Sequence, residues 1–280
     1  MKRFSTLISP EELKENLAAP ELRLVDCRAS LQDRDAGCKA YRDAHLPGAV
    51  FADLESDLSG PVVPGITGRH PLPSVPALVE RLRAWGIGNA SQVVAYDDAS
   101  GAFAARLWWL LRFLGHDAVA VLDGGFSAWS AAGYELTAAL PTLAAQDFTP
   151  TPRAEWLVTA DEVARSSDRT PLFDARAPAR FRGDEEPIDP VAGHIPGAQN
   201  LPFTENLRAG RFRPERELRA AFDAALAGHA AQDAIMYCGS GVTACHNVLA
   251  FAHVGLALPR LYAGSWSEWI TVPTRPVARG

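Results

Sequence analysis

The sequence has 280 residues, 48% of them hydrophobic and 21% charged, which is enough to bury one large core or two ordinary ones. The net charge of -6 argues against nucleic acid or an anionic membrane surface as a partner. No apolar run reaches the length of about 18 residues that crosses a bilayer, and no signal-peptide core follows the N-terminal charges. Four cysteines without a Cys-x-x-Cys pair are too few for a disulfide framework. We therefore expect a cytoplasmic, metal-free protein with free thiols.

The predicted elements alternate between strands and helices. In the first half they are a strand over 23–27, a helix that Ser74 caps, a strand over 92–96, a helix over 103–114 and a strand over 119–122. In the second half they are a strand over 172–174, a helix over 215–226, a strand over 234–237, a helix over 242–254 and a strand over 260–262. This alternation predicts an α/β fold with parallel sheets that helices cover on both faces.

The chain also repeats itself. Motifs of the first half return in the same order in the second: Leu24–Ala29 as Leu172–Ala177, His45–Ala49 as His194–Ala198, Val94–Tyr96 as Ile235–Tyr237, and Gly124–Trp129 as Gly264–Trp269. Both halves open with a capping residue followed by a glutamate three positions later, at Ser9 and at Thr159. We therefore predict two similar lobes, 1–137 and 154–280, joined by a proline-containing linker over 138–153.

The two lobes differ at one loop. In parallel sheets, ligands bind beyond the carboxyl ends of the strands, where a loop leads into the next helix. The second lobe has Cys238 at this place, whereas the first lobe has Asp97. A duplicated scaffold that keeps a thiol in only one copy predicts a single working site, in the second lobe.

Cys238 has a sequence context that favours a reactive thiolate. The loop that follows it, Gly239-Ser240-Gly241-Val242-Thr243, can point backbone N–H groups inward and leads into a helix N-terminus. Both features lower the pKa of a thiol and can hold a persulfide anion. The alternative is a buried, inert cysteine. Cys27, Cys38 and Cys245 have no comparable context, and Cys27, at a strand end, and Cys245, on a helix, are expected to be packing residues.

These motifs together resemble one family. The loop 238–243, the two His-x-Pro-Gly-Ala motifs, Asp-Gly-Gly-Phe at 123–126 and Gly-Ser-Trp-Ser-Glu-Trp at 264–269 resemble the 3-mercaptopyruvate sulfurtransferases, which are tandem members of the rhodanese superfamily. The resemblance covers about Leu7 to Pro276. It implies two rhodanese-like lobes, of which the first is inactive and the second catalytic.

The resemblance implies a ping-pong sulfur transfer without a metal or an organic cofactor. A small-molecule donor, 3-mercaptopyruvate or thiosulfate, passes sulfur to Cys238, and a thiol, thioredoxin or cyanide removes it. Thiosulfate enzymes usually carry basic residues directly after the cysteine. Here Gly239 and Ser240 stand at those positions, which favours 3-mercaptopyruvate, with thiosulfate as the alternative donor.

Comparison with the family further suggests a proton relay. In it, Ser240 works with a histidine and an acidic residue of the first lobe. The matching residues are His70 as the histidine, and Glu55 or Asp57 as the acid that orients it. The alternative is that His70 is an ordinary histidine of a surface loop.

The donor carboxylate would need a cation. Arg180 matches the arginine-bearing segment of the family, and a guanidinium has the right shape to bind a carboxylate with two hydrogen bonds. The second arginine that the family places shortly afterwards is missing from 185–190. Arg182, Arg69 or weaker contacts would have to replace it. The alternative for Arg180 is a solvated arginine on a loop.

Two other kinds of protein share this architecture. Cysteine phosphatases need an arginine six positions after the cysteine, where this chain has Ala244, so that activity is disfavoured. A non-enzymatic rhodanese-like sulfur-binding or sensing module is less favoured, because such modules commonly lose the cysteine. Gly124-Gly125 is not part of a Gly-x-Gly-x-x-Gly motif, which argues against dinucleotide binding.

Overall fold

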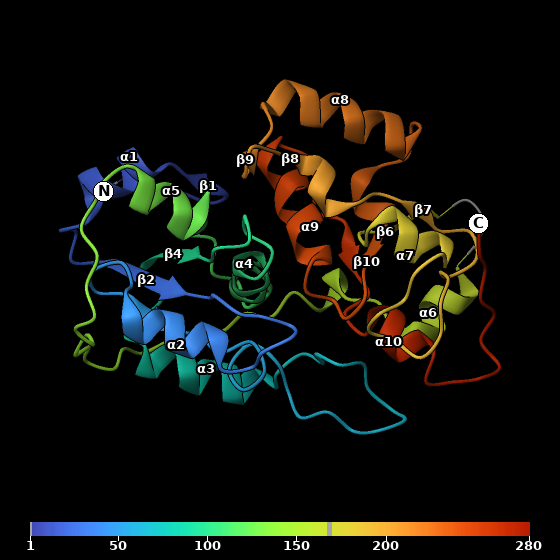
Figure 1. Cartoon of the computed structure of the whole chain (residues 1–280), viewed down its shortest axis with the longest axis horizontal. Coiled ribbons are helices and arrows are strands. Elements are labelled where there is room, and N and C mark those ends of the chain that lie inside the picture. Colours follow the sequence, from blue (N-terminus) through green and yellow to red (C-terminus); the bar gives the residue numbers. More distant parts are fainter. Residues whose placement is uncertain (1, 167–169) are drawn as a thin grey trace. The chain divides into compact units, whose positions relative to one another are not determined.

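The computed structural model describes residues 2–166 and 170–280, and these form two compact units (Figure 1). One unit comprises Met1–Gly60 and Pro73–Arg153, and the other comprises Pro61–Leu72 and Ala154–Gly280. The segment 138–153, which we predicted as a linker, groups with the first unit. Its backbone is anchored there, since the Thr151 N–H donates to the Leu114 carbonyl at 2.8 Å. Conversely, the loop Pro61–Leu72 groups with the second unit, and it brings His70 with it.

The first unit contains a parallel five-stranded sheet. Its strands lie in the order β1 (Leu7–Ile8), β5 (Val119–Leu122), β4 (Gln92–Tyr96), β2 (Leu22–Asp26) and β3 (Val50–Phe51). The helices are α1 (Pro10–Asn16), α2 (Ala36–Asp43), α3 (Val75–Ala84), α4 (Ala104–Phe113) and α5 (Gly125–Ala131). Figure 1 shows α1 and α5 on one side of the strands and α2 and α3 on the other. Both faces of this sheet are therefore covered, as the strand–helix alternation predicts.

The second unit contains a parallel four-stranded sheet. Its strands lie in the order β11 (Arg260–Leu261), β10 (Ile235–Tyr237), β6 (Leu172–Asp174) and β7 (Gln199–Asn200). The helices are α6 (Ala160–Arg165), α7 (Pro178–Arg182), α8 (Glu215–Leu226), α9 (Ala244–His253) and α10 (Ser265–Trp269), and a short hairpin joins β8 (Leu207–Arg208) to β9 (Arg211–Phe212). The predicted α/β class with two parallel sheets flanked by helices is confirmed.

Several predicted elements coincide with the observed ones. Strands β4, β5 and β6 and helix α8 have the predicted bounds, and both predicted capping boxes are present, at Ser9 and Thr159. Helix α9 begins at Ala244, two residues later than predicted. Thr243, directly before it, already has helical dihedral angles (φ -72°, ψ -15°), so the difference is confined to the first turn.

The repeated motifs hold each sheet to its loops in the same way in both units. In the first, the Arg28 side chain donates to the buried Asp26 carboxylate at 2.6 Å, and the Tyr96 hydroxyl donates to the same carboxylate at 2.8 Å. In the second, Arg176 donates to the buried Asp174 at 2.6 Å. These motifs belong to the internal repeat, and their contacts are structural. The chemistry must therefore be sought where the repeats differ.

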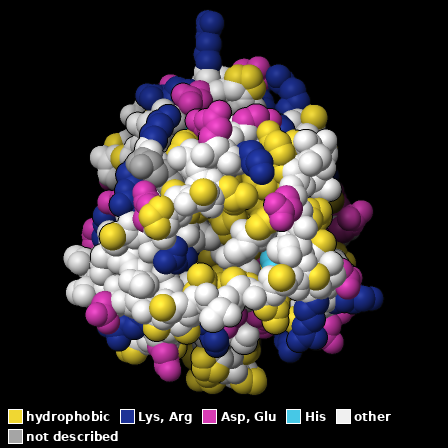
Figure 2. All heavy atoms as spheres, turned by 90° about the vertical axis from the view of Figure 1, so that its left-hand side faces the viewer, with side chains coloured by type: hydrophobic (Ala, Val, Ile, Leu, Met, Phe, Trp, Pro, Cys, Tyr) yellow, Lys and Arg dark blue, Asp and Glu magenta, His cyan; other side chains and the backbone are white. Residues whose placement is uncertain are grey.

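The charged side chains are mixed on the face of the molecule that Figure 2 shows. On the face that Figure 2 shows, basic and acidic side chains are interspersed with hydrophobic ones, and neither sign gathers into a large patch. This face offers no concentrated positive charge to a nucleic acid. Within residues 2–166 and 170–280, no helix has the length and hydropathy of a membrane span.

Candidate active site

The candidate site is built on the loop between β10 and α9. Cys238 is the first residue after β10 and is only 2% exposed. Its sulfur accepts a hydrogen bond from the Gly241 N–H at 3.1 Å, and its own N–H donates to the Ser265 hydroxyl at 3.1 Å. A side chain at Gly241 would overlap the Ala263 carbonyl oxygen, so only glycine fits there. The loop therefore curls around the sulfur and directs an N–H group at it, as the sequence predicts.

The repeated Gly-Ser-Trp-Ser motif braces this loop. The N–H of Trp266 donates to the Cys238 carbonyl at 3.0 Å, and the N–H of Ser267 donates to the Gly239 carbonyl at 2.9 Å. The first unit has the corresponding contact, from the Phe126 N–H to the Asp97 carbonyl at 2.8 Å. Hydrogen bonds from the start of α10 thus hold the backbone at residue 238 in place.

Asp97 shows what the loop can hold. Its carboxylate is fully buried and accepts four backbone N–H groups at 2.8 Å each, from Ala99, Gly101, Phe103 and Ala104. Burial raises the pKa of Asp97, while the four N–H donors oppose that rise. A loop of this kind can therefore bind a two-oxygen anion. Cys238 has a shorter side chain than Asp97, so the outer sulfur of a persulfide would extend toward the place that the carboxylate oxygens occupy in the first unit.

The structure brings His70 and Ser240 together. The Nδ1 atom of His70 lies 2.7 Å from the Ser240 Oγ, and the two residues are 4% and 5% exposed. The segment that carries His70 contacts the motif Gly264–Ser267, because the Arg69 N–H donates to the Ser267 hydroxyl at 3.1 Å. The contact that the family resemblance suggested is thus present within the second unit.

The two candidate acids lie in the other unit. Glu55 forms an ion pair with Arg34 at 3.6 Å, and Asp57 forms one with Arg81 at 2.8 Å. Burial raises the pKa of Asp57, and the Arg81 charge partly offsets this. The orienting role of either acid stays a prediction.

Arg180 lies in α7 and is held by two carboxylates. Its Nη2 atom is 2.7 Å from a Glu186 oxygen and 3.1 Å from an Asp189 oxygen, and its Nε atom is 3.1 Å from the same Glu186 oxygen. Both acids are buried. Arg182, the other predicted cation of this helix, has a half-exposed side chain and pairs with Asp184 at 2.8 Å. The structure therefore builds Arg180, rather than Arg182, into a fixed network.

Arg69 shares that network. It forms an ion pair with Asp189, the residue that also binds Arg180. A Cβ atom at Gly239 would lie 3.0 Å from the Arg69 Nη2 and 3.5 Å from the Arg180 Nη1. Burial lowers the pKa of Arg69, and the nearby Cys238 thiolate opposes this by favouring the charged guanidinium. Two guanidinium groups thus converge on the residue that follows Cys238.

Sequence reasoning missed Asp189 and Glu186. The stretch 185–190 was notable only for lacking an arginine. Its acidic side chains are the feature that matters, because they fix the two arginines in place. For Arg69, the signal in the sequence was its position directly before His70.

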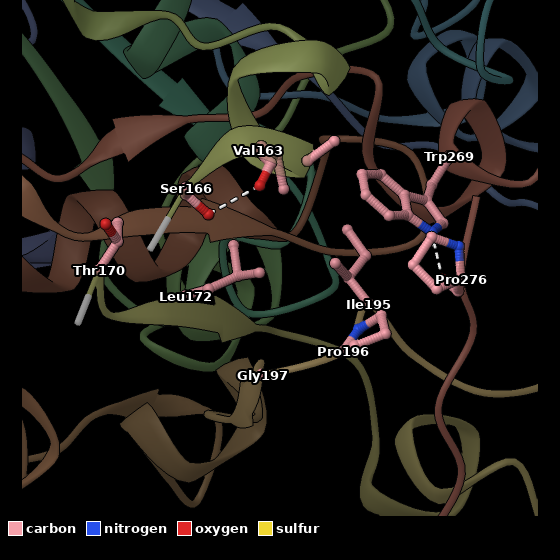
Figure 3. A pocket seen from close by; sticks show the side chains of 10 residues that line it. Val163, Ser166, Thr170, Leu172, Ile195, Pro196, Gly197, Trp269 and Pro276 are labelled. Atoms are coloured by element: carbon pink, nitrogen blue, oxygen red, sulfur yellow. Dashed lines mark hydrogen bonds between the residues drawn. The ribbon is translucent and has the colours of Figure 1, made fainter. Parts of the chain in front are cut away.

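The second unit also has a hollow away from Cys238. It has a volume of about 190 Å³, and Val163, Leu172, Ile195 and Trp269 are among the residues that line it (Figure 3). Figure 3 shows the Trp269 indole donating to the Pro276 carbonyl at its edge, at 2.9 Å. Cys238 and its loop do not line this hollow. Among the residues that the structure describes, no group of three or more His, Cys, Asp or Glu side chains is arranged to hold a metal ion.

Comparison with known proteins identifies the family of the chain. The rhodanese-like domain family matches the chain twice, over residues 9–132 and 159–271. A "Probable 3-mercaptopyruvate sulfurtransferase" of Pseudomonas aeruginosa is 53% identical over 278 residues, which cover 98% of each chain. The "Putative thiosulfate sulfurtransferase SseB" of Mycobacterium tuberculosis is 40% identical over 285 residues, covering 99% of this chain and 98% of that one.

The likeness extends to three dimensions. The structure of the 3-mercaptopyruvate sulfurtransferase from Leishmania major superposes with a TM-score of 0.86 at 36% identity, covering 97% of this chain and 75% of that chain. The paired sheets, the duplicated motifs and these matches have one explanation. The chain belongs to the rhodanese-like family and carries two copies of its domain.

Proposed function

We propose that this protein is a sulfurtransferase that takes sulfur from 3-mercaptopyruvate onto Cys238 and passes it to a thiol or to cyanide. The observation that carries the proposal is the position of the Cys238 sulfur, which accepts the Gly241 N–H at 3.1 Å beside the Ser240–His70 pair. The relative that is 53% identical bears the name of this activity, and that supports the choice of donor.

The first half of the reaction loads the cysteine. The Cys238 thiolate attacks the sulfur of 3-mercaptopyruvate, an S–S bond forms and the donor's C–S bond breaks. The electrons of the broken bond remain on the leaving carbon, and the donor's thiol proton moves to it, which gives pyruvate and the Cys238 persulfide anion. Ser240 and His70 are close enough to each other to move this proton between sulfur and carbon. The Gly241 N–H stabilises the anion left on the loop.

The second half returns the enzyme to its starting state. A thiolate or cyanide attacks the outer sulfur, and the Cys238 thiolate leaves with the electrons of the S–S bond. This is a displacement at sulfur and needs neither a metal nor an organic cofactor. A protein thiol such as thioredoxin in the cytoplasm is the acceptor that we propose, because a reducing compartment supplies such thiols.

Arg180 is the residue that we propose for the donor carboxylate. Its guanidinium is oriented by Glu186 and lies beside Gly239, the residue that follows Cys238, and this supports a role in binding the donor. A fixed guanidinium can bind a carboxylate with two parallel hydrogen bonds. Donor binding would then position the C–S bond for attack by Cys238.

Thiosulfate is the second candidate donor. A relative that is 40% identical is named for that donor, and the convergence of two guanidinium groups beside Gly239 would suit its charge. A non-enzymatic sulfur-binding module is the weaker alternative, since Cys238 keeps a complete loop around it.

One experiment decides between these functions. Steady-state rates are measured with 3-mercaptopyruvate and with thiosulfate in parallel, with cyanide as the acceptor and thiocyanate as the product. A higher kcat/KM for 3-mercaptopyruvate supports the proposal. A higher kcat/KM for thiosulfate would make thiosulfate the donor. Turnover of neither compound would favour a binding module.

A further inference from the structure

Arg69 and Arg180 come from distant parts of the sequence and are joined by one carboxylate. Asp189 binds Arg69 through one oxygen and Arg180 through the other. Glu186 holds Arg180 from a second side at 2.7 Å. All of these residues belong to the second unit. Such a bridge fixes the spacing of two cations that would otherwise repel each other.

Each guanidinium has at least one nitrogen that is not used in these ion pairs. Arg69 uses its Nη1 atom for Asp189, and Arg180 uses its Nε and Nη2 atoms for the two acids. Across residues 2–166 and 170–280, no protein atom accepts a hydrogen bond from the Arg69 Nη2 or the Arg180 Nη1. These two atoms are also the ones that converge beside Gly239. The side chains are 29% and 17% exposed, so a small anion can reach them.

We propose that Arg69 is a second donor-binding residue, and that Arg69 and Arg180 together form a clamp for the donor's anionic end. Asp189 is the positioning residue of this clamp. The inference rests on the proposed function and deepens it, because it names the side chains that hold the anionic end of the donor. A glycine at 239 suits this arrangement, since a Cβ atom there would lie only 3.0 Å from the Arg69 Nη2.

The test compares Arg69→Ala and Arg69→Lys with the unaltered enzyme. We expect Arg69→Ala to raise the KM for 3-mercaptopyruvate about tenfold, with a smaller change in kcat, because a charge-assisted contact to the donor is lost. Arg69→Lys restores part of the affinity, since ammonium keeps the charge but not the planar geometry. Asp189→Asn raises KM in the same direction, because it weakens the ion pair of Arg69 and one of the two ion pairs of Arg180. Arg208→Ala serves as a matched control, because Arg208 is an exposed arginine paired with a carboxylate in the same unit.

A second measurement separates donor binding from an effect on the sulfur. The enzyme is loaded with inorganic polysulfide, and release of sulfur to cyanide is followed in a single turnover. We expect Arg69→Ala to leave this rate unchanged, because no carboxylate is involved in it. An unchanged KM would overturn the proposal. A slower release of sulfur in addition would make Arg69 a residue that stabilises the Cys238 thiolate.

Failure of the proposed function would be visible separately. Pyruvate carries the carboxylate but no sulfur, and its inhibition constant can be measured against whichever donor the enzyme uses. If thiosulfate proves to be that donor, the proposed function fails. A weaker inhibition by pyruvate in Arg69→Ala would still support the clamp, and an unchanged inhibition would refute it.

Discussion

The Nδ1 atom of His70 lies 2.7 Å from the Oγ of Ser240, although 170 residues separate them along the chain. Both side chains are buried, so the hydrogen bond is shielded from competing water. The loop Pro61–Leu72 delivers the histidine, and the loop after β10 delivers the serine next to Cys238. In the mechanism that we propose, this pair passes the proton between the donor and the imidazole.

Loss of the Ser240 hydroxyl should affect the two donors differently. Only 3-mercaptopyruvate needs a proton moved onto the leaving carbon, so Ser240→Ala should lower its kcat by about 100-fold. The rate with thiosulfate should fall much less. His70→Gln, measured in parallel with both donors, should show the same selectivity. Equal losses with both donors would mean that the pair maintains the shape of the loop instead.

The sequence predicts the parts of the site that lie on one short segment. Cys238 follows from a strand, a glycine loop and a helix in a row, and from its replacement by Asp97 in the other repeat. The sequence does not predict the Asp189 bridge, because loop conformations and ion pairs between distant loops have no periodic pattern. The place of the loop Pro61–Leu72 was also unexpected, since sequence order suggests that it belongs with the first lobe.

Cys238→Ser should abolish sulfur transfer and leave the fold intact. Oxygen replaces sulfur with little change in volume, but a serine hydroxyl does not ionise near neutral pH and cannot carry sulfur as a persulfide. Mass spectrometry of the donor-treated enzyme should show a gain of about 32 Da, one sulfur atom, on the peptide with Cys238. Cys38→Ser is the control and should keep both activity and mass gain. A mass gain on the peptide with Cys27 instead would mean that Cys27 is the cysteine that carries the sulfur.

Arg180→Ala should weaken use of the donor far more than it weakens folding. The guanidinium is partly accessible, and we expect a loss of about 1.5–3 kcal/mol of donor binding, hence at least a tenfold lower kcat/KM. Arg180→Lys should recover only part of this, because ammonium cannot make two parallel hydrogen bonds. Thermal unfolding measured on the same variants provides the comparison. Unchanged kinetics with both donors would exclude Arg180 from the site.

Asp97→Ala should destabilise the first unit. The substitution leaves four buried backbone N–H groups without their acceptor, and we expect a cost of about 3 kcal/mol or more in the free energy of unfolding. Asp97→Asn should cost less, because its amide oxygen can still accept some of these bonds. Denaturant unfolding measures both. If Asp97→Ala were as stable as the unaltered protein, the carboxylate would not be what holds this loop.

Donor preference depends on which cations lie beside the sulfur. Ser240 follows Gly239 in the loop and is neutral, whereas Arg69 and Arg180 approach the loop from outside. The loop residues touch the reacting atoms, so their contacts change between the ground state and the transition state. More distant cations mostly determine KM. We therefore expect a higher kcat/KM for 3-mercaptopyruvate than for thiosulfate.

Ser240→Lys tests directly whether the loop residues, rather than Arg69 and Arg180, determine the donor preference. The substitution removes the hydroxyl that contacts His70, and it adds a cation near the outer oxygens of thiosulfate. Turnover of 3-mercaptopyruvate should fall for the same reason as in Ser240→Ala, while turnover of thiosulfate should rise. Ser240→Met is the matched control, because it has similar bulk and lacks the charge. A rise in thiosulfate turnover with lysine but not with methionine would show that charge in the loop selects the donor. Equal effects of both substitutions would assign the preference to Arg69 and Arg180, which reach the same place from outside the loop.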